Sequence, residues 1–295
     1  MSIFFVTAII LGCCLSILSL GIFLGIKIFN IPDITTDGSY TFGAVITGVL
    51  MLQNISLFII LPLSILGGAI AGCFTGFIHT KFKVQPLLAG ILVMTGFYSI
   101  NLAIMGKSNL PLLNVSHFFN TQIIKIGNDT FSEPFNQLLI CLLIVGLIIF
   151  LLNYFLKTDM GLALRATGNN ESMANAVGIN TNSKKILGLA IGNGCIALSG
   201  FLVAQYQGFI DVNMGIGIVI TGLGSVLIAN TFIKWFGVHN LLLQLCCVVF
   251  GSIVFQLVLA ITLTLGVDTI YLKLITALIV LSIVAFSNSK NQQAL

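Results

Sequence analysis

The chain has 295 residues, of which 58% are hydrophobic and 7% are charged, and its mean hydropathy is +1.13. Soluble domains average about 45–50% apolar and about 25% charged residues, so this composition excludes an ordinary soluble domain and predicts a polytopic membrane protein. The net charge of +4 comes from twelve Lys and Arg against eight Asp and Glu, which are too few and too scattered to form a nucleic-acid-binding surface.

The apolar residues fall into runs long enough to cross a membrane, which requires about 20 residues in a helix. Eight such runs follow one another along the chain: Ile3–Ile26, Ile55–Ile78, Pro86–Met105, Gln137–Leu156, Ile186–Tyr206, Ile216–Ile233, Leu241–Leu265 and Thr269–Phe286. The first run has no basic segment before it and is longer than the core of a signal peptide, so we expect it to remain as a span. The pattern predicts an all-α polytopic membrane protein with about eight transmembrane helices, in one domain that covers residues 1–295.

A ninth apolar run, Tyr40–Leu52, is too short to span comfortably and follows the polar sequence PDITTDGS. A half-helix, a re-entrant segment and a short tilted span all fit this pattern. A re-entrant segment would leave both termini in the cytoplasm, whereas a crossing would move the N-terminus to the outside.

Basic residues favour one side of the predicted membrane. Lys81, Lys83 and Lys234 lie in loops that alternation places on the same side as the polar segment 157–185. The positive-inside rule assigns that side to the cytoplasm and leaves the segment Gly106–Asn136 outside.

Glycines repeat every four residues at Gly68, Gly72 and Gly76. Such spacing gives a helix a flat face and favours close packing against another helix, although a transport path could run beside the seam.

The predicted spans hold almost none of the titratable groups that an enzyme needs. His79, His117 and His239 fall in loops without a paired arrangement, and the seven cysteines sit mainly in apolar runs without a CxxC motif. The triplet Gly106–Ser108 reads GKS, but Asn101 stands where a phosphate-binding loop requires its first glycine. We therefore expect no catalytic residue, metal site or cofactor, and any ATP that drives the protein must be hydrolysed by another subunit.

Six polar residues are candidates for lining a path through the membrane: Asp33, Asp37, Thr95, Tyr98, Asn101 and Asn193. Thr95, Tyr98 and Asn101 are spaced by three and share one helical face. No carboxylate is expected at the centre of a span. The two aspartates flank the broken region, where they could face a cavity or anchor a loop at the interface. For each neutral residue, hydrogen bonding between helices is the alternative interpretation.

The polar segment 158–185 contains the sequence GLALRATGNNESMANAVGIN. It resembles the cytoplasmic loop of permease subunits from ATP-binding-cassette importers of the branched-chain amino acid and ribose type. The residues that match that pattern are Gly161, Ala163, Arg165, Ala166, Gly168, Asn170, Ala176, Gly178 and Ile179. The sequences IPDITTDGSYTFGA and LLAGIL resemble the branch described as tryptophan/tyrosine-type permeases, and the resemblance covers essentially the whole chain.

This resemblance implies a multi-pass protein of the bacterial cytoplasmic (inner) membrane that passes a small polar solute, an amino acid or related compound. The implied partners are an ABC ATPase subunit, an extracytoplasmic solute-binding protein, membrane lipid and a second permease subunit, expected to be a second copy of this chain; no nucleic acid is expected. An ion-coupled secondary transporter that needs no ATPase is the alternative.

The resemblance also makes residues 157–185 the loop that couples the permease to its ATPase. The coupling residues it implies are Gly161, Arg165, Gly168, Asn170, Glu171, Ala176 and Gly178. We expect a short helix from about Asn170 to Val177, with Asn169 or Asn170 as its N-cap and Glu171 at the positive end of its dipole. Arg165 either contacts the ATPase or only satisfies the positive-inside rule.

Overall fold

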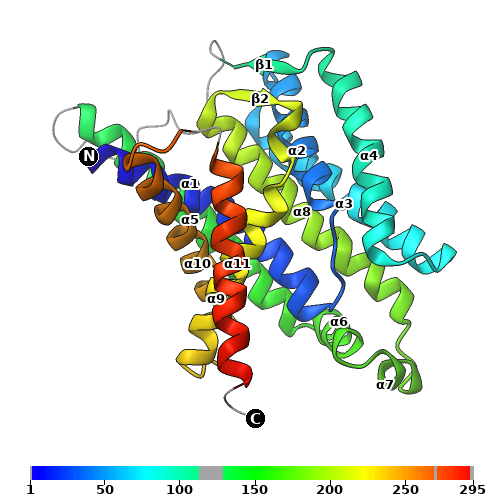
Figure 1. Ribbon diagram of the computed structural model, residues 1–295. Coiled ribbons are helices and arrows are strands. Elements are labelled where there is room, and N and C mark those ends of the chain that lie inside the picture. Colours follow the sequence, from blue (N-terminus) through cyan, green and yellow to red (C-terminus); the bar gives the residue numbers. More distant parts are fainter. Residues whose placement is uncertain (1, 113–128, 269–270, 293–295) are drawn as a thin grey trace.

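The structure is a computed structural model that describes residues 2–112, 129–268 and 271–292, and these residues form helices and two short strands (Figure 1). In chain order the elements are α1 (Ser2–Phe23), the π-helix η1 (Leu24–Ile28), α2 (Thr36–Leu52), α3 (Leu57–Phe82), α4 (Pro86–Met105), β1 (Asn109–Pro111), α5 (Asp129–Lys157), α6 (Asp159–Asn169), α7 (Glu171–Ala176), α8 (Thr181–Gln207), β2 (Phe209–Asp211), the 3-10 helix η3 (Val212–Gly215), α9 (Ile218–Trp235), α10 (Leu241–Thr264) and α11 (Leu272–Gln292).

The part of the chain that the structure describes contains seven helices long and apolar enough to cross a membrane. They are α1 continued by η1, α3, α4, α5, α8, α9 and α10, and α11 adds a shorter apolar stretch, Leu272–Ile283. These elements correspond to the eight predicted runs, so the prediction of an all-α polytopic membrane protein is confirmed.

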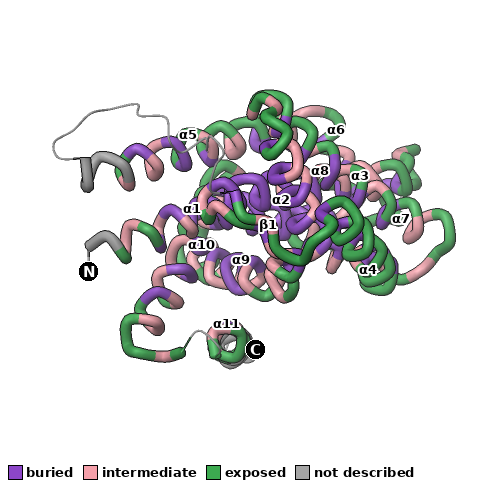
Figure 2. Tube along the Cα trace, turned by 90° about the horizontal axis from the view of Figure 1, so that it is seen from above, coloured by how far each residue is buried: buried purple, intermediate pink, exposed green. Residues whose placement is uncertain are grey.

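Helix α8 lies at the centre of the bundle, where Figure 2 shows most of the buried residues. It packs against α1, α2 and α3. A Cβ atom added at Gly68 or Gly72 of α3 would collide with backbone carbonyl oxygens of α8. The glycine repeat is therefore a packing seam that brings the two backbones together, as its spacing predicts.

The second crossing is broken. The chain leaves the helical path after η1, runs without helix from residue 29 to residue 35, and begins α2 only at Thr36. The end of η1 meets α6, because a Cβ at Gly168 would collide with the carbonyl oxygen of Ile28. The end of α2 meets β2, because a Cβ at Gly48 would collide with Ile210. Residues 29–52 therefore run from one end of the bundle to the other, with a helix in only part of the crossing.

The two ends of the bundle are distinct (Figure 1). One end carries α6, α7 and the end of α11, and the other carries the antiparallel pair β1–β2, in which Asn109 pairs with Asp211. Lys81 lies in the last turn of α3, which packs on the beginning of α8 at the α6–α7 end of the bundle, and Lys234 lies in the last turn of α9. The positive-inside rule assigns that end to the cytoplasm, so α1 begins at the outer end. Residues 113–128 of the predicted outer segment, with His117, lie outside the described residues.

Candidate functional site

The non-helical stretch before α2 is tied to the middle of α8 through Asp33 and Asn193. The Asn193 Nδ2 atom donates to Asp33 Oδ2 at 2.6 Å and to the carbonyl oxygen of Leu189 at 2.9 Å. The Ser39 hydroxyl donates to Asn193 Oδ1 at 2.7 Å, and the backbone N–H of Thr35 donates to Asp33 Oδ1 at 2.8 Å. Irregular backbone is tolerated at membrane depth only where protein groups satisfy it, and Asp33 does so for the Thr35 N–H.

The position of Asp33 contradicts the expectation that no carboxylate lies at the centre of a span. Its partner Asn193 is fully buried and lies near the middle of α8, which spans Thr181–Gln207. A carboxylate therefore does lie level with the centre of a span. Hydropathy could not reveal this, because Asp33 reaches that depth on a non-helical segment rather than inside an apolar run.

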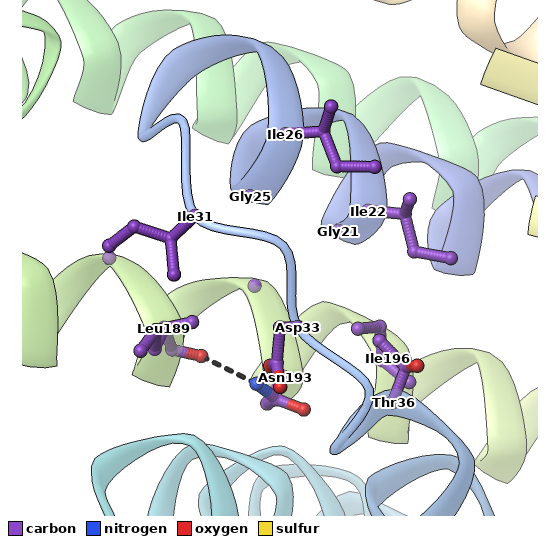
Figure 3. A pocket seen from close by; sticks show the side chains of 12 residues that line it. Gly21, Ile22, Gly25, Ile26, Ile31, Asp33, Thr36, Leu189, Asn193 and Ile196 are labelled. Carbon is purple, nitrogen blue, oxygen red and sulfur yellow. Dashed lines mark hydrogen bonds between the residues drawn. The ribbon is translucent and has the colours of Figure 1, made fainter. Parts of the chain in front are cut away.

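A small cavity lies beside this cluster, between the glycines of α1 and η1 and those of α8 (Figure 3). Its volume of about 20 Å³ is room for about one water molecule. The Thr36 hydroxyl faces it, is 1% exposed and has no hydrogen-bond partner among the described residues. Close approach of the glycine backbones keeps this space narrow, and Asp33, Thr36 and Asn193 are the polar side chains in its mostly apolar lining.

Asp37, four residues after Asp33, lies in a different environment. Its carboxylate accepts hydrogen bonds from the backbone N–H groups of Gly217 at 2.9 Å and Val219 at 3.1 Å. These groups belong to the first turn of α9, so Asp37 caps that helix from another element. The carboxylate is thus a helix anchor, and it also lines an open cleft.

The cleft lies between α2, α4 and η3 and has a volume of about 210 Å³. The residues that line it are Asp37, Gly38, Thr41, Met94, Thr95, Tyr98, Asn101, Val212 and Ile216. The shared helical face predicted for Thr95, Tyr98 and Asn101 is present, and all three face this cleft. Tyr98 donates a hydrogen bond to Asn213 Oδ1 at 3.4 Å, and Asn101 Oδ1 is buried without a partner among the described residues.

The six path candidates therefore form two groups on either side of the start of α2. Asp33 and Asn193 belong to the buried cluster, and Asp37, Thr95, Tyr98 and Asn101 belong to the cleft. Sequence reasoning missed the hydroxyl pair Thr35 and Thr75, whose Oγ1 atoms lie 2.7 Å apart between the broken crossing and α3. The run of hydroxyl residues in TTDGS is the signal that could have indicated it.

The polar segment 157–185 folds into two short helices and the start of α8. Thr158 caps α6 by accepting the Gly161 N–H at 3.4 Å, and Gly161 packs so closely on the end of α5 that a Cβ would collide with the Phe155 carbonyl oxygen. Gly168, near the other end of α6, makes the contact with Ile28 described above. Both positions must be glycine, because any side chain there would prevent the close contacts with Phe155 and Ile28.

The predicted short helix is α7. Asn170 is its N-cap and accepts the Met173 N–H at 3.0 Å, which decides between the two predicted caps. Glu171 in its first turn accepts a hydrogen bond from Lys185 Nζ at 2.6 Å and one from the Thr181 hydroxyl at 3.4 Å. The hydrogen bond from Lys185 holds the pKa of Glu171 below its ordinary value. This contact ties α7 to the beginning of α8.

The outer surface of α6 and α7 combines charge with apolar groups. Arg165 is exposed, and the one ion pair among the described residues, Lys185 with Glu171, does not involve it. Met173 is 67% exposed and Val177 is 73% exposed. Ala176 ends α7, and Gly178 follows with φ of 85°, a left-handed conformation that favours glycine.

Comparison with known proteins identifies the family. Residues 4–285 match the family described as the permease component of branched-chain amino acid transport systems. A tyrosine transport system permease protein of Clostridioides difficile is 42% identical over 93% of this chain and 88% of the relative. The branched-chain amino acid permease LivH of Salmonella typhimurium is 23% identical over 69% of this chain and 71% of the relative. A ribose import permease of Haemophilus influenzae is 23% identical over 64% of this chain and 57% of the relative.

No solved structure matches the chain. The family model covers nearly the whole sequence, and the apolar helices, the polar cytoplasmic segment and the lack of a nucleotide-binding motif agree with it. The chain therefore belongs to the permease family of ATP-binding-cassette importers, as a non-catalytic, multi-pass membrane subunit that works with a separate ATPase.

Proposed function

We propose that this permease carries an amino acid, with an aromatic amino acid such as tyrosine as the first candidate. The solute class is supported by the tyrosine permease that is 42% identical over most of both chains. The observation that carries the transport role is the broken crossing, whose non-helical stretch begins beside the contact between Ile28 and Gly168 and holds Asp33 against Asn193 at the middle of α8. Asp33, Asn193 and the cleft residues are proposed to line the path.

The proposed coupling loop is the segment 157–185. Its exposed surface offers a cation at Arg165 and large apolar side chains at Met173 and Val177. Exposed apolar groups on the water-facing side of a membrane protein are typical of a docking surface. We propose that the ATPase binds this surface, with Arg165 as a contact rather than only a topology signal.

The transmission of movement from this loop to the path is proposed to run through η1. The α6 backbone at Gly168 touches the backbone at Ile28, and the non-helical stretch that holds Asp33 begins at the next residue. A displacement of α6 would therefore reach Asp33 through five residues of chain. Asn30 in that stretch has φ of 54°, so the connection is bent rather than straight.

A solute-binding protein is proposed to deliver the solute at the β1–β2 end, and a second copy of this chain is proposed to close the cleft. Thr95 and Tyr98 line the cleft and are exposed on α4, so the cleft is open on this side. A second permease subunit on this side would cover them and supply the missing wall of the path.

Co-purification tests the ATPase partner directly. The permease is expressed with the ATPase encoded beside it, and the complex is isolated through a tag on the permease. We expect Arg165→Glu combined with Val177→Asp to reduce the recovered ATPase strongly, and Lys107→Glu at the opposite end to leave it unchanged. Equal recovery with the double variant would contradict the assigned docking surface.

Competition for uptake tests the solute. In vesicles that contain the permease, its ATPase and its binding protein, unlabelled tyrosine should reduce ATP-dependent uptake of labelled tyrosine more than unlabelled ribose does. Competition by ribose alone would overturn the amino-acid assignment. Uptake that collapses with an ion gradient but ignores ATP depletion would favour the ion-coupled alternative.

A further inference from the structure

We infer that the cleft between α2, α4 and η3 contains a subsite for the primary ammonium group of the transported solute, held by Asp37 and Asn101. The inference rests on the proposed function, because it assigns a chemical group of the solute to particular residues of the path. Neither residue's role follows from the family, and the hydrogen-bonding groups that remain free in the cleft indicate what it can bind.

Two hydroxyl groups that line the cleft, those of Thr41 and Thr95, are free only as hydrogen-bond acceptors. The Thr95 hydroxyl donates to the carbonyl oxygens of Ile91 and Leu92 at 3.0 and 2.9 Å, and the Thr41 hydroxyl donates to the Asp37 carbonyl oxygen at 2.9 Å. Each hydroxyl hydrogen is therefore committed to the backbone, and the hydroxyl oxygen is left as an acceptor. A cleft of this kind suits a ligand that brings several donors.

Asn101 supplies the independent observation that the site is incomplete. Its side chain is 1% exposed and lines the cleft, and its Oδ1 atom has no hydrogen-bond partner among the described residues. An unpaired buried acceptor costs free energy that the folded protein recovers only when a donor arrives. The atom is thus positioned to accept from a donor that none of the described residues provides.

Asp37 supplies the negative charge. A carboxylate offers about four lone-pair positions, and the two backbone N–H groups of α9 occupy two of them. No Lys, Arg or His is among the residues that line the cleft, and Lys273 acts on Asp37 electrostatically from α11 without lining it. An ammonium group, with three donors and a positive charge, matches both Asp37 and Asn101.

The remaining walls are apolar. Met94 of α4, Val212 of η3 and Ile216 complete the lining, beside the ring of Tyr98. A solute with an ammonium group at one end and an apolar or aromatic body fits this division of the cleft. The chemistry therefore favours an amine or amino acid over a sugar, whose hydroxyl groups carry no charge for Asp37.

Transport by the complete importer tests the subsite. The permease, its ATPase and its binding protein are reconstituted in liposomes, and ATP-dependent uptake of L-tyrosine is measured. We expect Asn101→Leu to reduce uptake about tenfold or more, since it removes a hydrogen bond to a charged group. Its thermal stability should stay equal or rise, because the substitution also removes an unpaired buried acceptor.

Asn153→Leu is the matched control. Asn153 of α5 is also buried with an unpaired Oδ1 atom within the described residues, but it does not line the cleft. This variant should gain stability in the same way and transport tyrosine like the wild type. If Asn101→Leu also transports like the wild type, the subsite is wrong and the proposed function stands. If the wild-type importer shows no ATP-dependent uptake of tyrosine, the proposed solute is wrong as well.

Ligand stabilisation of the isolated permease tests the chemical group. Tyramine keeps the ammonium group of tyrosine, and 4-hydroxyphenylpropionate lacks it. At millimolar concentration, tyramine should raise the unfolding temperature of the wild type but not of Asn101→Leu, and the deaminated acid should raise neither. An equal shift from both probes, or none from tyramine, would overturn the inference.

Discussion

Asn193 is the side chain on which the broken crossing depends most. It donates to Asp33 and to the Leu189 carbonyl oxygen and accepts from Ser39, so one amide joins α8 to both sides of the start of α2. Sequence spacing could not reveal this contact, because 160 positions separate Asn193 from Asp33. A lone Asn in a glycine-rich span gives no signal of its partner.

Asn193→Ala should destabilise the protein by roughly 2–4 kcal/mol, since it leaves the Oδ2 atom of a partly buried carboxylate, Asp33, without its donor. Ser39→Ala removes only one neutral hydrogen bond and should cost about 1 kcal/mol. Denaturant unfolding in mixed micelles measures both free energies. Equal losses for the two variants would show that the Asp33 contact contributes nothing beyond the amide's other bonds.

Glu171 makes the α7 contact sensitive to pH. Its pKa in the folded protein is lower than its ordinary value of 4.5, because Lys185 donates to it. A group with a depressed pKa stabilises the fold above its unfolded pKa and loses that contribution as pH falls through the folded value. The tie between α7 and α8 should therefore weaken below about pH 4.5.

Amide hydrogen exchange of α7 measures this effect. Exchange corrected for the intrinsic rate should accelerate in the wild type as the pH is lowered below about 4.5. Glu171→Gln should exchange faster at neutral pH and lose this dependence on pH, whereas Asp159→Asn in α6 should leave it in place. A pH-independent wild type would refute the role of this ion pair.

At the scale of elements, α6 and η1 form the contact through which we propose that movement passes. Gly168 lies so close to Ile28 that even one methyl group would collide with its carbonyl oxygen. Asn170, one of the two predicted N-caps, caps α7, and Thr158 caps α6, a helix that was not predicted although Thr is a good N-cap residue. The contact of α6 with η1 could not be predicted, because no feature of the sequence near Ile28 marks the end of this span as a surface that another helix contacts.

Gly168→Ala should separate α6 from η1 and uncouple the permease. We expect tyrosine uptake per ATP hydrolysed to fall about tenfold, the change that about 1.4 kcal/mol produces, while the ATPase still binds. Gly146→Ala in α5 is the control, because a Cβ there meets nothing within 4 Å. Normal uptake by Gly168→Ala would remove η1 from the proposed route.

At the scale of the whole molecule, hydropathy was sufficient to predict the apolar spans but not to predict how residues 29–52 cross the membrane. Runs of about 20 apolar residues report membrane helices reliably because the requirement is local. The crossing of residues 29–52 needs Asp33, Thr35 and Ser39 to find partners on α3 and α8, which only the tertiary structure provides. The cleft was partly predictable, since Thr95, Tyr98 and Asn101 recur on one helical face.

Labelling from the two sides of the membrane tests this topology. In a cysteine-free background, Lys27→Cys at the end of η1 should react from the same side as Lys83→Cys at the end of α3. Asn54→Cys, between α2 and α3, should react from the opposite side. A re-entrant α2 would instead place Lys27 and Asn54 on one side.

The central claim is that this permease holds the path and receives its energy from a separate ATPase through α6 and α7. Accumulation of labelled tyrosine in liposomes tests it most directly, with the binding protein supplied on the outer side and ATP on the ATPase side. We predict accumulation against a gradient only when the permease and the ATPase are both present and ATP is hydrolysed. Accumulation in liposomes that contain the permease alone would contradict the account.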